Sequence, residues 1–474
     1  METKKWRCTV CGQIFEGAEP PVPCPVCGAG ADAFVQIGQA APTRWKCTVC
    51  GQIFEGAQPP VPCPVCGAGA DAFVALGVQT EAAARNDTDE QFVIIGGGGA
   101  ALAAAKAIRE RNHTAHITIV CGEGVPPYNR PALSDMVADG YSFSAIELQE
   151  LGWYKQQNIK LVMDAKAQAV DAAAHTVTLT DGRVLPYAKL LLATGANAFC
   201  PVKCEAGSVP VRVLRSYVDA QALLSAVRMG SRVVVVGGGI LGLEAALALR
   251  EQGAQVTVVE LAARLMSIQA DEFASAVIET RLAALGMQIY TGVMVQKVDA
   301  EGIHLSNGEL LHADLVLVSA GIRSELTLAA QLGLQTGRGI VVDGAMRTSA
   351  PDIFAAGDCA EFEGRVAGLW GAALDMGNAA GAAMCGDAAA YHAPVPATAF
   401  EGGGINLFAV GNVNGERLQT VVVHDEPTGV YHKLVLKNGK LVGVLMMGEV
   451  KNGAAAVAAV ERGDGLKAAL ALLV

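Results

Sequence analysis

The 474-residue sequence has few aromatic residues (5%) and few charged residues (17%), and its net charge is −11. Nucleic-acid binding needs a basic surface, so this balance argues against DNA or RNA as a partner. The N-terminal METKKWRC lacks the apolar core of a signal peptide, and no apolar run is long enough to span a membrane. These absences predict a soluble cytoplasmic protein, with a peripheral protein held by a partner as the alternative. Abundant hydrophobic residues (52%) and 55 glycines suit closely packed α/β layers.

Eight of the 13 cysteines fall in four CxxC pairs near the N-terminus. The stretch WRCTVCGQIFEGAEPPVPCPVCGAGADAF, residues 6–34, returns almost unchanged at 45–73. Two CxxC turns present four thiolates to one ion, so each copy predicts a tetrahedral four-sulfur metal site. Iron and zinc both fit such a site, and a module this small needs its metal to fold. The expected ligands are Cys8, Cys11, Cys24 and Cys27 in the first copy and Cys47, Cys50, Cys63 and Cys66 in the second.

Both modules resemble the short rubredoxin-type domain of rubrerythrins, in which one iron carries one electron. The resemblance rests on CGQIFEG, on CPVCGAG, and on the aromatic residue two positions before the first cysteine, Trp6 or Trp45. It implies two mononuclear Fe(Cys)4 centres, whereas ligand geometry alone leaves structural zinc as the alternative. The modules are expected at 1–38 and 39–76, and the linker that follows, 77–90, has no apolar period.

The larger body contains two strand–glycine–helix–strand units, each typical of a dinucleotide-binding fold. The first glycine makes the turn, the second lets a pyrophosphate approach the backbone, and the third small position packs helix on strand. Glu260 ends the second strand of the second unit. A carboxylate there accepts hydrogen bonds from a ribose 2′-OH and repels a 2′-phosphate, which favours NADH over NADPH. The pattern is filled by Gly96, Gly98 and Ala101 in the first unit and by Gly237, Gly239 and Gly242 in the second.

From about Phe92 onward the chain resembles the FAD/NAD-linked reductases with two dinucleotide domains, and within them the NADH:rubredoxin reductase branch and its nitrite-reductase-like relatives. LLATGA, IFAAGDCA, PPYNRPALS and GLWGAALDMGNAAGAAM carry the resemblance. It implies an α/β fold with two Rossmann-like domains, in which the first unit holds FAD and the second holds NADH, followed by a C-terminal α+β domain. The expected boundaries are 91–205 with 313–388 for the FAD domain, 206–312 for the NAD domain and 389–474 for the C-terminal domain.

The resemblance also implies roles for individual residues. Asp358 would hold the flavin ribityl chain, and Glu244 would lie near the nicotinamide as the catalytic candidate. Trp370 would lie near the flavin ring, with a plain core aromatic as the alternative. The other expected flavin contacts are Asn129, Arg130, Pro131, Thr194 and Gly195.

The sequence departs from this family at two positions. Relatives have an acidic residue at the end of the second FAD strand, whereas this chain has Cys121, and Glu123 is the nearest substitute for the ribose contact. Relatives often have a lysine near flavin N5, where this chain has Asp135. A negative charge there opposes reduced anionic flavin, so either Asp135 points away or the flavin chemistry differs.

The C-terminal stretch alternates apolar and polar residues and predicts antiparallel strands with a turn at Asn438–Lys440, followed by an alanine-rich helix. The family uses this domain for flavin coverage or dimerisation, so a homodimer is one expectation.

No cysteine stands where related disulfide reductases, peroxidases or thioredoxin reductases carry theirs. The scattered cysteines are mostly expected to be small buried residues, although Cys200 and Cys204 could form a thiol switch. The metal modules therefore offer the exit for electrons. We expect an NADH:rubredoxin-type FAD oxidoreductase (EC 1.18.1.-) whose iron centres pass electrons to a protein such as rubrerythrin or a diiron flavoprotein, in the oxygen or peroxide defence of an anaerobe. The alternatives are an NADH oxidase or peroxidase with accessory iron, and a flavoprotein with zinc-bound docking modules.

Overall fold

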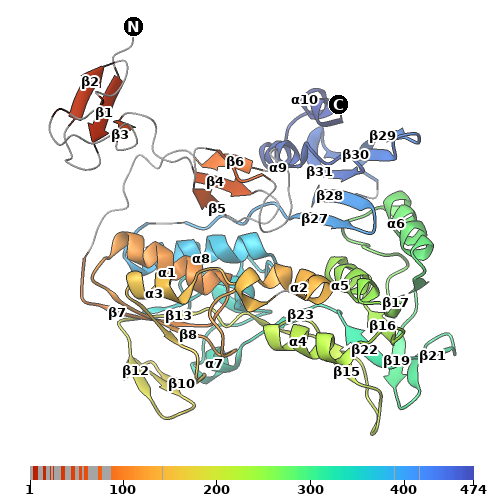
Figure 1. Ribbon diagram of the computed structural model, residues 1–474, viewed down its shortest axis with the longest axis horizontal. Coiled ribbons are helices and arrows are strands. Elements are labelled where there is room, and N and C mark those ends of the chain that lie inside the picture. Colours follow the sequence, from red (N-terminus) through yellow and green to blue (C-terminus); the bar gives the residue numbers. More distant parts are fainter. Residues whose placement is uncertain are drawn as a thin grey trace.

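The structure is a computed structural model (Figure 1). It describes residues 87–473 apart from 141, 389 and 416, and within the first 86 residues the segments 4–8, 14–17, 34–37, 44–47, 53–55, 58–61 and 73–76 with residues 22 and 25. None of the helices in this part of the chain is both long and apolar enough to cross a membrane.

The repeated N-terminal sequence forms the same small sheet twice. The first sheet has the order β2-β1-β3 and the second the order β5-β4-β6, and every pair is antiparallel. The register is also repeated, because Cys8 lies opposite Phe34 and Cys47 lies opposite Phe73. The strands are β1 (Lys4–Cys8), β2 (Ile14–Gly17), β3 (Phe34–Ile37), β4 (Arg44–Cys47), β5 (Ile53–Glu55) and β6 (Phe73–Leu76).

The first dinucleotide unit is built on a five-stranded parallel sheet of order β25-β13-β7-β8-β9. Its strands are short and almost wholly apolar, as expected of parallel strands covered on both faces. They are β7 (Gln91–Ile95), β8 (His116–Val120), β9 (Ile159–Val162), β13 (Lys189–Leu192) and β25 (Ile353–Ala355). The three-stranded antiparallel sheet attached to this unit comprises β10 (Ala167–Asp171), β11 (Thr176–Leu179) and β12 (Val184–Pro186).

Two helices, α1 (Gly99–Arg111) and α8 (Trp370–Met384), lie side by side along this sheet (Figure 1). They approach closely because glycines of α8 face the backbone of α1. A Cβ at Gly377 would lie 2.2 Å from the carbonyl oxygen of Ala100, and one at Gly381 would lie 2.4 Å from that of Ala104. The contact brings the start of α8 next to the start of α1.

The second unit repeats the architecture with the order β15-β22-β16-β17-β18, again parallel. Its strands are β15 (Val211–Val213), β16 (Arg232–Val236), β17 (Gln255–Glu260), β18 (Gln288–Thr291) and β22 (Leu315–Val318). Its helices are α4 (Tyr217–Ala226), α5 (Ile240–Glu251) and α6 (Glu272–Ala284), and β19 (Val295–Val298), β20 (Gly302–Leu305) and β21 (Leu310–His312) form a small antiparallel sheet. Both predicted strand–glycine–helix–strand units are therefore confirmed.

The two units are joined by an antiparallel pair of strands, β14 (Ala196–Ala198) and β23 (Ile322–Ser324). The remaining elements of this region are α2 (Leu133–Asp139), α3 (Leu151–Gln156), α7 (Thr327–Gln331), and the parallel pair β24 (Ile340–Val342) and β26 (Ala360–Phe362). Both connections between the units run through β14 and β23, and we call this pair of strands the hinge.

The C-terminal region is a five-stranded antiparallel sheet of order β27-β28-β31-β30-β29, with α9 (Gly453–Arg462) and α10 (Leu466–Ala469) after it. The predicted turn is confirmed, since Asn438 and Gly439 both have positive φ angles, as a two-residue type I′ hairpin requires. The strands are β27 (Ala397–Gly402), β28 (Ile405–Gly411), β29 (Gln419–Asp425), β30 (Val430–Lys437) and β31 (Lys440–Met447).

A buried carboxylate fastens this sheet to the second unit. Asp271 caps α6, accepting a hydrogen bond from the Ala274 N–H at 3.0 Å, and also accepts bonds from the Tyr431 hydroxyl at 2.7 Å and Lys433 Nζ at 2.9 Å. Burial alone would raise the pKa of Asp271, but these hydrogen bonds outweigh it and the pKa is lowered. The ionised carboxylate therefore stabilises the fold above the unfolded pKa of about 4, and the contribution is lost as the pH falls through the folded pKa.

Replacing Lys433 by methionine should lower the free energy of unfolding by about 1–3 kcal/mol at pH 7, because it leaves a buried carboxylate short of a partner. The loss should shrink below about pH 4, where Asp271 takes up a proton. Urea unfolding at both pH values measures it, with Lys437→Met on the exposed end of β30 as the control. Equal losses in the two variants would contradict this role for Asp271.

Candidate functional site

The first glycine loop connects β7 to α1 and has the shape of a phosphate cradle. Gly96 has a φ of +130°, and a Cβ there would lie 2.0 Å from the carbonyl oxygen of Ala193. Above Gly98 the space is open, since among the described residues no atom outside the neighbouring backbone lies within 4 Å of where its Cβ would be. Ala101 is fully buried against the sheet. The N-terminus of α1 thus faces open space across a small residue, as a bound pyrophosphate requires.

The second loop, between β16 and α5, has the same design. Gly237 has a φ of +121°, and a Cβ there would lie 2.3 Å from the Ser319 carbonyl oxygen. Gly239 is open in the same way as Gly98, and a Cβ at Gly242 would lie 2.0 Å from the Gly237 carbonyl oxygen. The third small position therefore serves close packing, as predicted.

The structure places Glu260 at this second loop. One carboxylate oxygen accepts the N–H of Gly238 and the other accepts the N–H of Ala262, both at 2.6 Å. Each oxygen keeps a further lone pair for an incoming donor. The carboxylate is thus fixed beside the open loop, where a nucleotide ribose would lie.

In the first unit, Cys121 occupies the position that corresponds to Glu260. The Gly96 N–H bonds to the carbonyl oxygen of Val120, the residue before Cys121, as the Gly237 N–H bonds to that of the residue before Glu260. Cys121 is fully buried, and burial raises the pKa of its thiol to about 12, so the thiol is neutral.

Glu123, the predicted substitute for the ribose contact, is paired with two neighbouring side chains. Its two carboxylate oxygens accept hydrogen bonds from Arg130 at 2.5 Å and from the Tyr128 hydroxyl at 2.6 Å. The Glu123 carboxylate therefore forms an ion pair with Arg130, seven residues further on. Cys121 lies under the glycine loop, since a Cβ at Gly97 would lie 3.2 Å from its Cβ.

Two buried polar atoms of the predicted flavin contacts have no hydrogen-bond partner in the described part of the chain, Asn129 Oδ1 and Trp370 Nε1. Trp370 begins α8 and packs over the first turn of α1, because a Cβ at Gly99 would lie 2.7 Å from its indole ring. Trp370 therefore lies at the open end of α1. Pro131 is exposed next to Arg130. The two buried atoms without a partner, Asn129 Oδ1 and Trp370 Nε1, fit a ligand with polar groups.

Asp358 lies in a short 3-10 helix, Gly357–Cys359, close to Thr194 and Gly195. Its Oδ2 accepts a hydrogen bond from Arg215 at 2.6 Å, with both side chains mostly buried. The Thr194 hydroxyl donates to the carbonyl oxygen of Glu325 at 3.1 Å, and Gly195 has a φ of +71°. The structure thus brings Asp358, Thr194 and Gly195 together at the hinge, at the carboxyl end of the first sheet.

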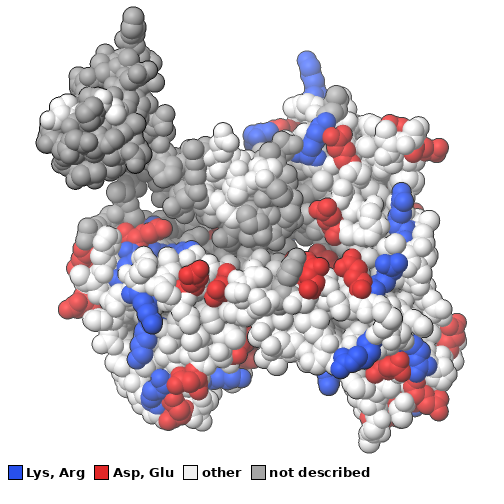
Figure 2. Space-filling view, in the orientation of Figure 1, with Lys and Arg blue, Asp and Glu red and all other residues white. Residues whose placement is uncertain are grey.

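Glu244 lies on α5 and faces Ser134 and Asp135 at the start of α2. Burial is the main cause that raises the pKa of Glu244, the Asp135 charge adds to it, and a hydrogen bond from Ser134 opposes it, leaving the pKa at about 7. Burial also raises the pKa of Asp135, as do the charges of Asp139 and Glu251. Figure 2 shows acidic side chains exposed over α2 and α5. Asp135 therefore belongs to an acidic seam between the two helices.

Arg215 is a residue of this site that sequence reasoning missed. It lies in VRVLRSYVDA, which has no cofactor motif, and contacts Asp358 across 143 residues of chain. The sequence does show a helix start next to Arg215, because Ser216 is followed three residues later by Asp219. These two residues form a capping box at α4.

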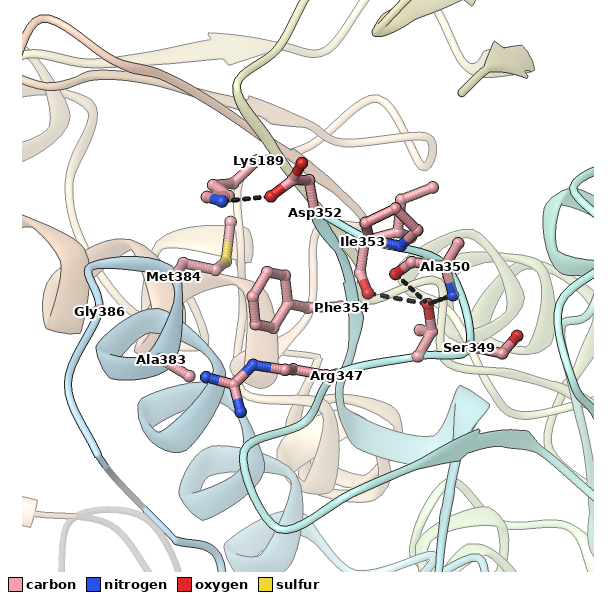
Figure 3. Close-up of a pocket in the computed structure, with 12 residues that line it drawn as sticks. Lys189, Arg347, Ser349, Ala350, Asp352, Ile353, Phe354, Ala383, Met384 and Gly386 are labelled. Carbon is pink, nitrogen blue, oxygen red and sulfur yellow. Dashed lines mark hydrogen bonds and ion pairs between the residues drawn. The ribbon is translucent and has the colours of Figure 1, made fainter. Parts of the chain in front are cut away.

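The described residues also line a cavity of about 430 Å³, away from the glycine loops (Figure 3). Figure 3 shows Phe354 between Met384 and Arg347, with the ion pair of Lys189 and Asp352 nearby. Lys189 begins β13, so this cavity lies at the amino ends of the parallel strands. Nucleotides bind at the carboxyl ends, so the cavity is not the cofactor site.

Of the predicted metal ligands, Cys8 ends β1 and Cys47 ends β4, at equivalent places in the repeated sheets, and Cys47 is fully buried. The other six lie outside the described residues: Cys11, Cys24, Cys27, Cys50, Cys63 and Cys66.

Three family models match the chain. One described as pyridine nucleotide-disulphide oxidoreductase matches residues 90–377. One described as rubrerythrin, rubredoxin-like domain matches 6–35 and 45–74, and one described as rubredoxin NAD+ reductase C-terminal domain matches 396–464.

Similar proteins agree with these matches. A nitrite reductase (NAD(P)H) of Bacillus subtilis is 33% identical over 74% of this chain and 45% of its own length. The NADH-rubredoxin oxidoreductase of Clostridium acetobutylicum is 28% identical over 71% of this chain and 86% of its own length. The crystal structure of NADH:rubredoxin oxidoreductase from Clostridium acetobutylicum matches with a TM-score of 0.70 and 27% identity, covering 81% of this chain and 100% of that one.

The chain spans less than half the length of the first curated relatives that it matches. The family model nevertheless covers most of the chain and both glycine loops. The chain belongs to the pyridine nucleotide-disulphide oxidoreductase family, in its NADH:rubredoxin reductase-like branch, and carries two rubredoxin-like domains at its N-terminus.

Proposed function

We propose that this chain is an NADH-dependent FAD oxidoreductase (EC 1.18.1.-) that passes electrons to its own two rubredoxin-type iron centres and on to a protein acceptor. The observation that carries the proposal is the joining of two four-cysteine modules to a body with two open dinucleotide loops. The body is similar to the NADH-rubredoxin oxidoreductase of Clostridium acetobutylicum, whose name pairs NADH with a rubredoxin. This similarity supports a rubredoxin-type centre as the electron acceptor.

The residues around the first loop fit FAD. The open N-terminus of α1 suits the pyrophosphate, Asn129 Oδ1 and Trp370 Nε1 can take polar groups of the cofactor, and Asp358 can accept from a ribityl hydroxyl. Bound FAD would supply a hydride acceptor that can release its electrons one at a time. The proposed binding residues are those predicted from the sequence, with Arg130, Pro131, Thr194 and Gly195 completing the set.

The second loop fits NADH. Gly239 leaves the N-terminus of α5 open, and Glu260 is held beside it by two backbone N–H groups. A fixed carboxylate accepts from a 2′-OH and repels a 2′-phosphate, which favours NADH. Glu244, two residues after Gly242 on α5, would then lie at the nicotinamide end.

Two of the thiols near the first loop are unsuited to accept electrons from a flavin. Cys121 is fully buried below the loop, and Cys359 is fully buried and donates to the carbonyl oxygen of Leu192 at 3.2 Å. The first-unit helix α1 contains no cysteine. We therefore assign the exit to the modules, which requires iron because zinc has no redox chemistry. A final acceptor such as rubrerythrin or a diiron flavoprotein, serving oxygen or peroxide defence in an anaerobe, completes the proposal.

Anaerobic titration of the purified chain with NADH tests the route. Bleaching of both the flavin and a red ferric-thiolate band after about two equivalents of NADH would support it, because FAD takes two electrons and each iron takes one. The control is protein loaded with zinc, which should end at about one equivalent. A red band that persists after the flavin has bleached would contradict electron transfer from the flavin to the iron centres. No red band after iron-replete expression would instead favour zinc-bound docking modules.

A further inference from the structure

Arg215 stands where the second unit meets the hinge. It follows β15, and the next residue, Ser216, caps α4 through a capping box with Asp219. Asp219 Oδ2 also accepts the Arg215 N–H at 3.1 Å. The backbone of Arg215 is thereby fixed to the first turn of a helix in the second unit.

The side chain of Arg215 crosses to the first unit. Its Nε donates to the carbonyl oxygen of Ala196, on hinge strand β14, at 3.1 Å. Its Nη2 donates to Asp358 Oδ2 at 2.6 Å, and both side chains are mostly buried, with 22% and 16% exposed. The planar guanidinium thus holds the hinge with one nitrogen and the carboxylate with another, which a lysine could not reproduce.

The carbonyl oxygen of Arg215 is held in turn by Arg130, in the segment PPYNRPALS. Arg130 donates to this oxygen and, through its other nitrogen, pairs with Glu123. Beside this contact, the Tyr217 N–H on α4 donates to the Tyr128 hydroxyl at 3.0 Å. Three segments far apart in the sequence therefore meet at Arg215.

We propose that Arg215 is a positioning residue that fixes the Asp358 carboxylate for the flavin and couples it to the orientation of the second unit. The inference rests on the proposed role of Asp358 at FAD. A carboxylate has two oxygens, and Arg215 takes Oδ2, which leaves Oδ1 for a ribityl hydroxyl. The guanidinium also neutralises a carboxylate that would otherwise disfavour the reduced anionic flavin.

Replacing Arg215 by methionine should weaken FAD binding about tenfold or more, because it removes a mostly buried hydrogen bond to a charged group. The flavin midpoint potential should become more negative, since Asp358 loses its counter-charge. Arg215→Lys should have an FAD affinity and a midpoint potential between those of the parent and of Arg215→Met. Lysine keeps the positive charge but cannot donate to Ala196 and Asp358 from one planar group. Flavin fluorescence and spectroelectrochemistry measure affinity and potential. The matched control is Arg212→Met, since Arg212 on β15 contacts only the carbonyl oxygen of the neighbouring Val211 among its described hydrogen bonds.

A double-mutant cycle with Asp358→Asn separates positioning from general loss of stability. If Arg215 acts through Asp358, Arg215→Lys should cost little further FAD affinity in the Asp358→Asn background. Additive losses, or an Arg215→Met variant that matches Arg212→Met in affinity and potential, would overturn the inference. Failure of the unaltered chain to bind FAD would overturn the proposed function instead.

Discussion

Alanine at Gly96 should abolish FAD binding, whereas alanine at Gly237 should leave the flavin bound and abolish its reduction by NADH. Each glycine has a positive φ angle, and a Cβ at either position would lie within 2.3 Å of a carbonyl oxygen of the neighbouring strand-end segment. The backbone must shift to relieve such a contact, and the shift displaces the loop that faces the phosphates. We expect a loss of at least about 100-fold in the affected affinity, about 3 kcal/mol, the upper range for forced backbone strain.

Gly182→Ala provides a matched control for these two variants. Gly182 also has a positive φ, +87°, but no other residue in the described part of the chain comes within 4 Å of its Cβ position. The Gly182→Ala variant should lose about 1–2 kcal/mol of stability, because alanine is strained at a positive φ. It should still bind both cofactors. Flavin content after gel filtration measures FAD binding, and calorimetry measures NADH binding. Stopped-flow absorbance measures the reduction of the flavin by NADH. Dithionite should still bleach the flavin of Gly237→Ala, and loss of flavin from that variant would contradict the assignment of the second loop to NADH.

The parts of the fold and of the site that the sequence predicted are those encoded within short segments. The glycine loops, Glu260 at the end of β17 and the Asn438–Gly439 turn each follow from local backbone requirements. Their placement in the structure agrees with the prediction because few distant residues can alter them.

The parts that sequence reasoning could not give depend on distant partners. Arg215 and Asp358 lie 143 residues apart, and no spacing rule joins them. Glu123 forms an ion pair with Arg130, which the sequence pattern did not predict. The sequence left open whether the Asp135 side chain points toward the flavin or away from it. The structure places it beside Glu244, Asp139 and Glu251. The domain boundaries and the assigned cofactor contacts remain predictions.

The affinity for NAD+ should rise with pH across neutrality, and Glu244→Gln should remove that rise. The pKa of Glu244 is raised to about 7, first by burial and then by the charge of Asp135. Below that pH the side chain is neutral, and above it the side chain carries a negative charge. The nicotinamide ring is cationic in NAD+ and neutral in NADH, so ionised Glu244 favours NAD+ selectively. For two opposite charges near each other in a partly buried site, we expect an attraction of about 1–2 kcal/mol, or about 5–30-fold in affinity.

Calorimetric titration of NAD+ and NADH between pH 6 and 8 measures this difference, with about constant NADH affinity expected. Glu251→Gln is the matched control, because Glu251 ends the same helix and is exposed. The stability of the fold gives an independent reading. A glutamate with a raised folded pKa weakens the fold increasingly as the pH climbs from about 4 to 7, and the penalty is complete above 7. Glu244→Gln should therefore melt at a higher temperature than the parent at pH 8. A variant that gains stability and still shows the pH-dependent rise in NAD+ affinity would place Glu244 in a buried seam but away from the nicotinamide.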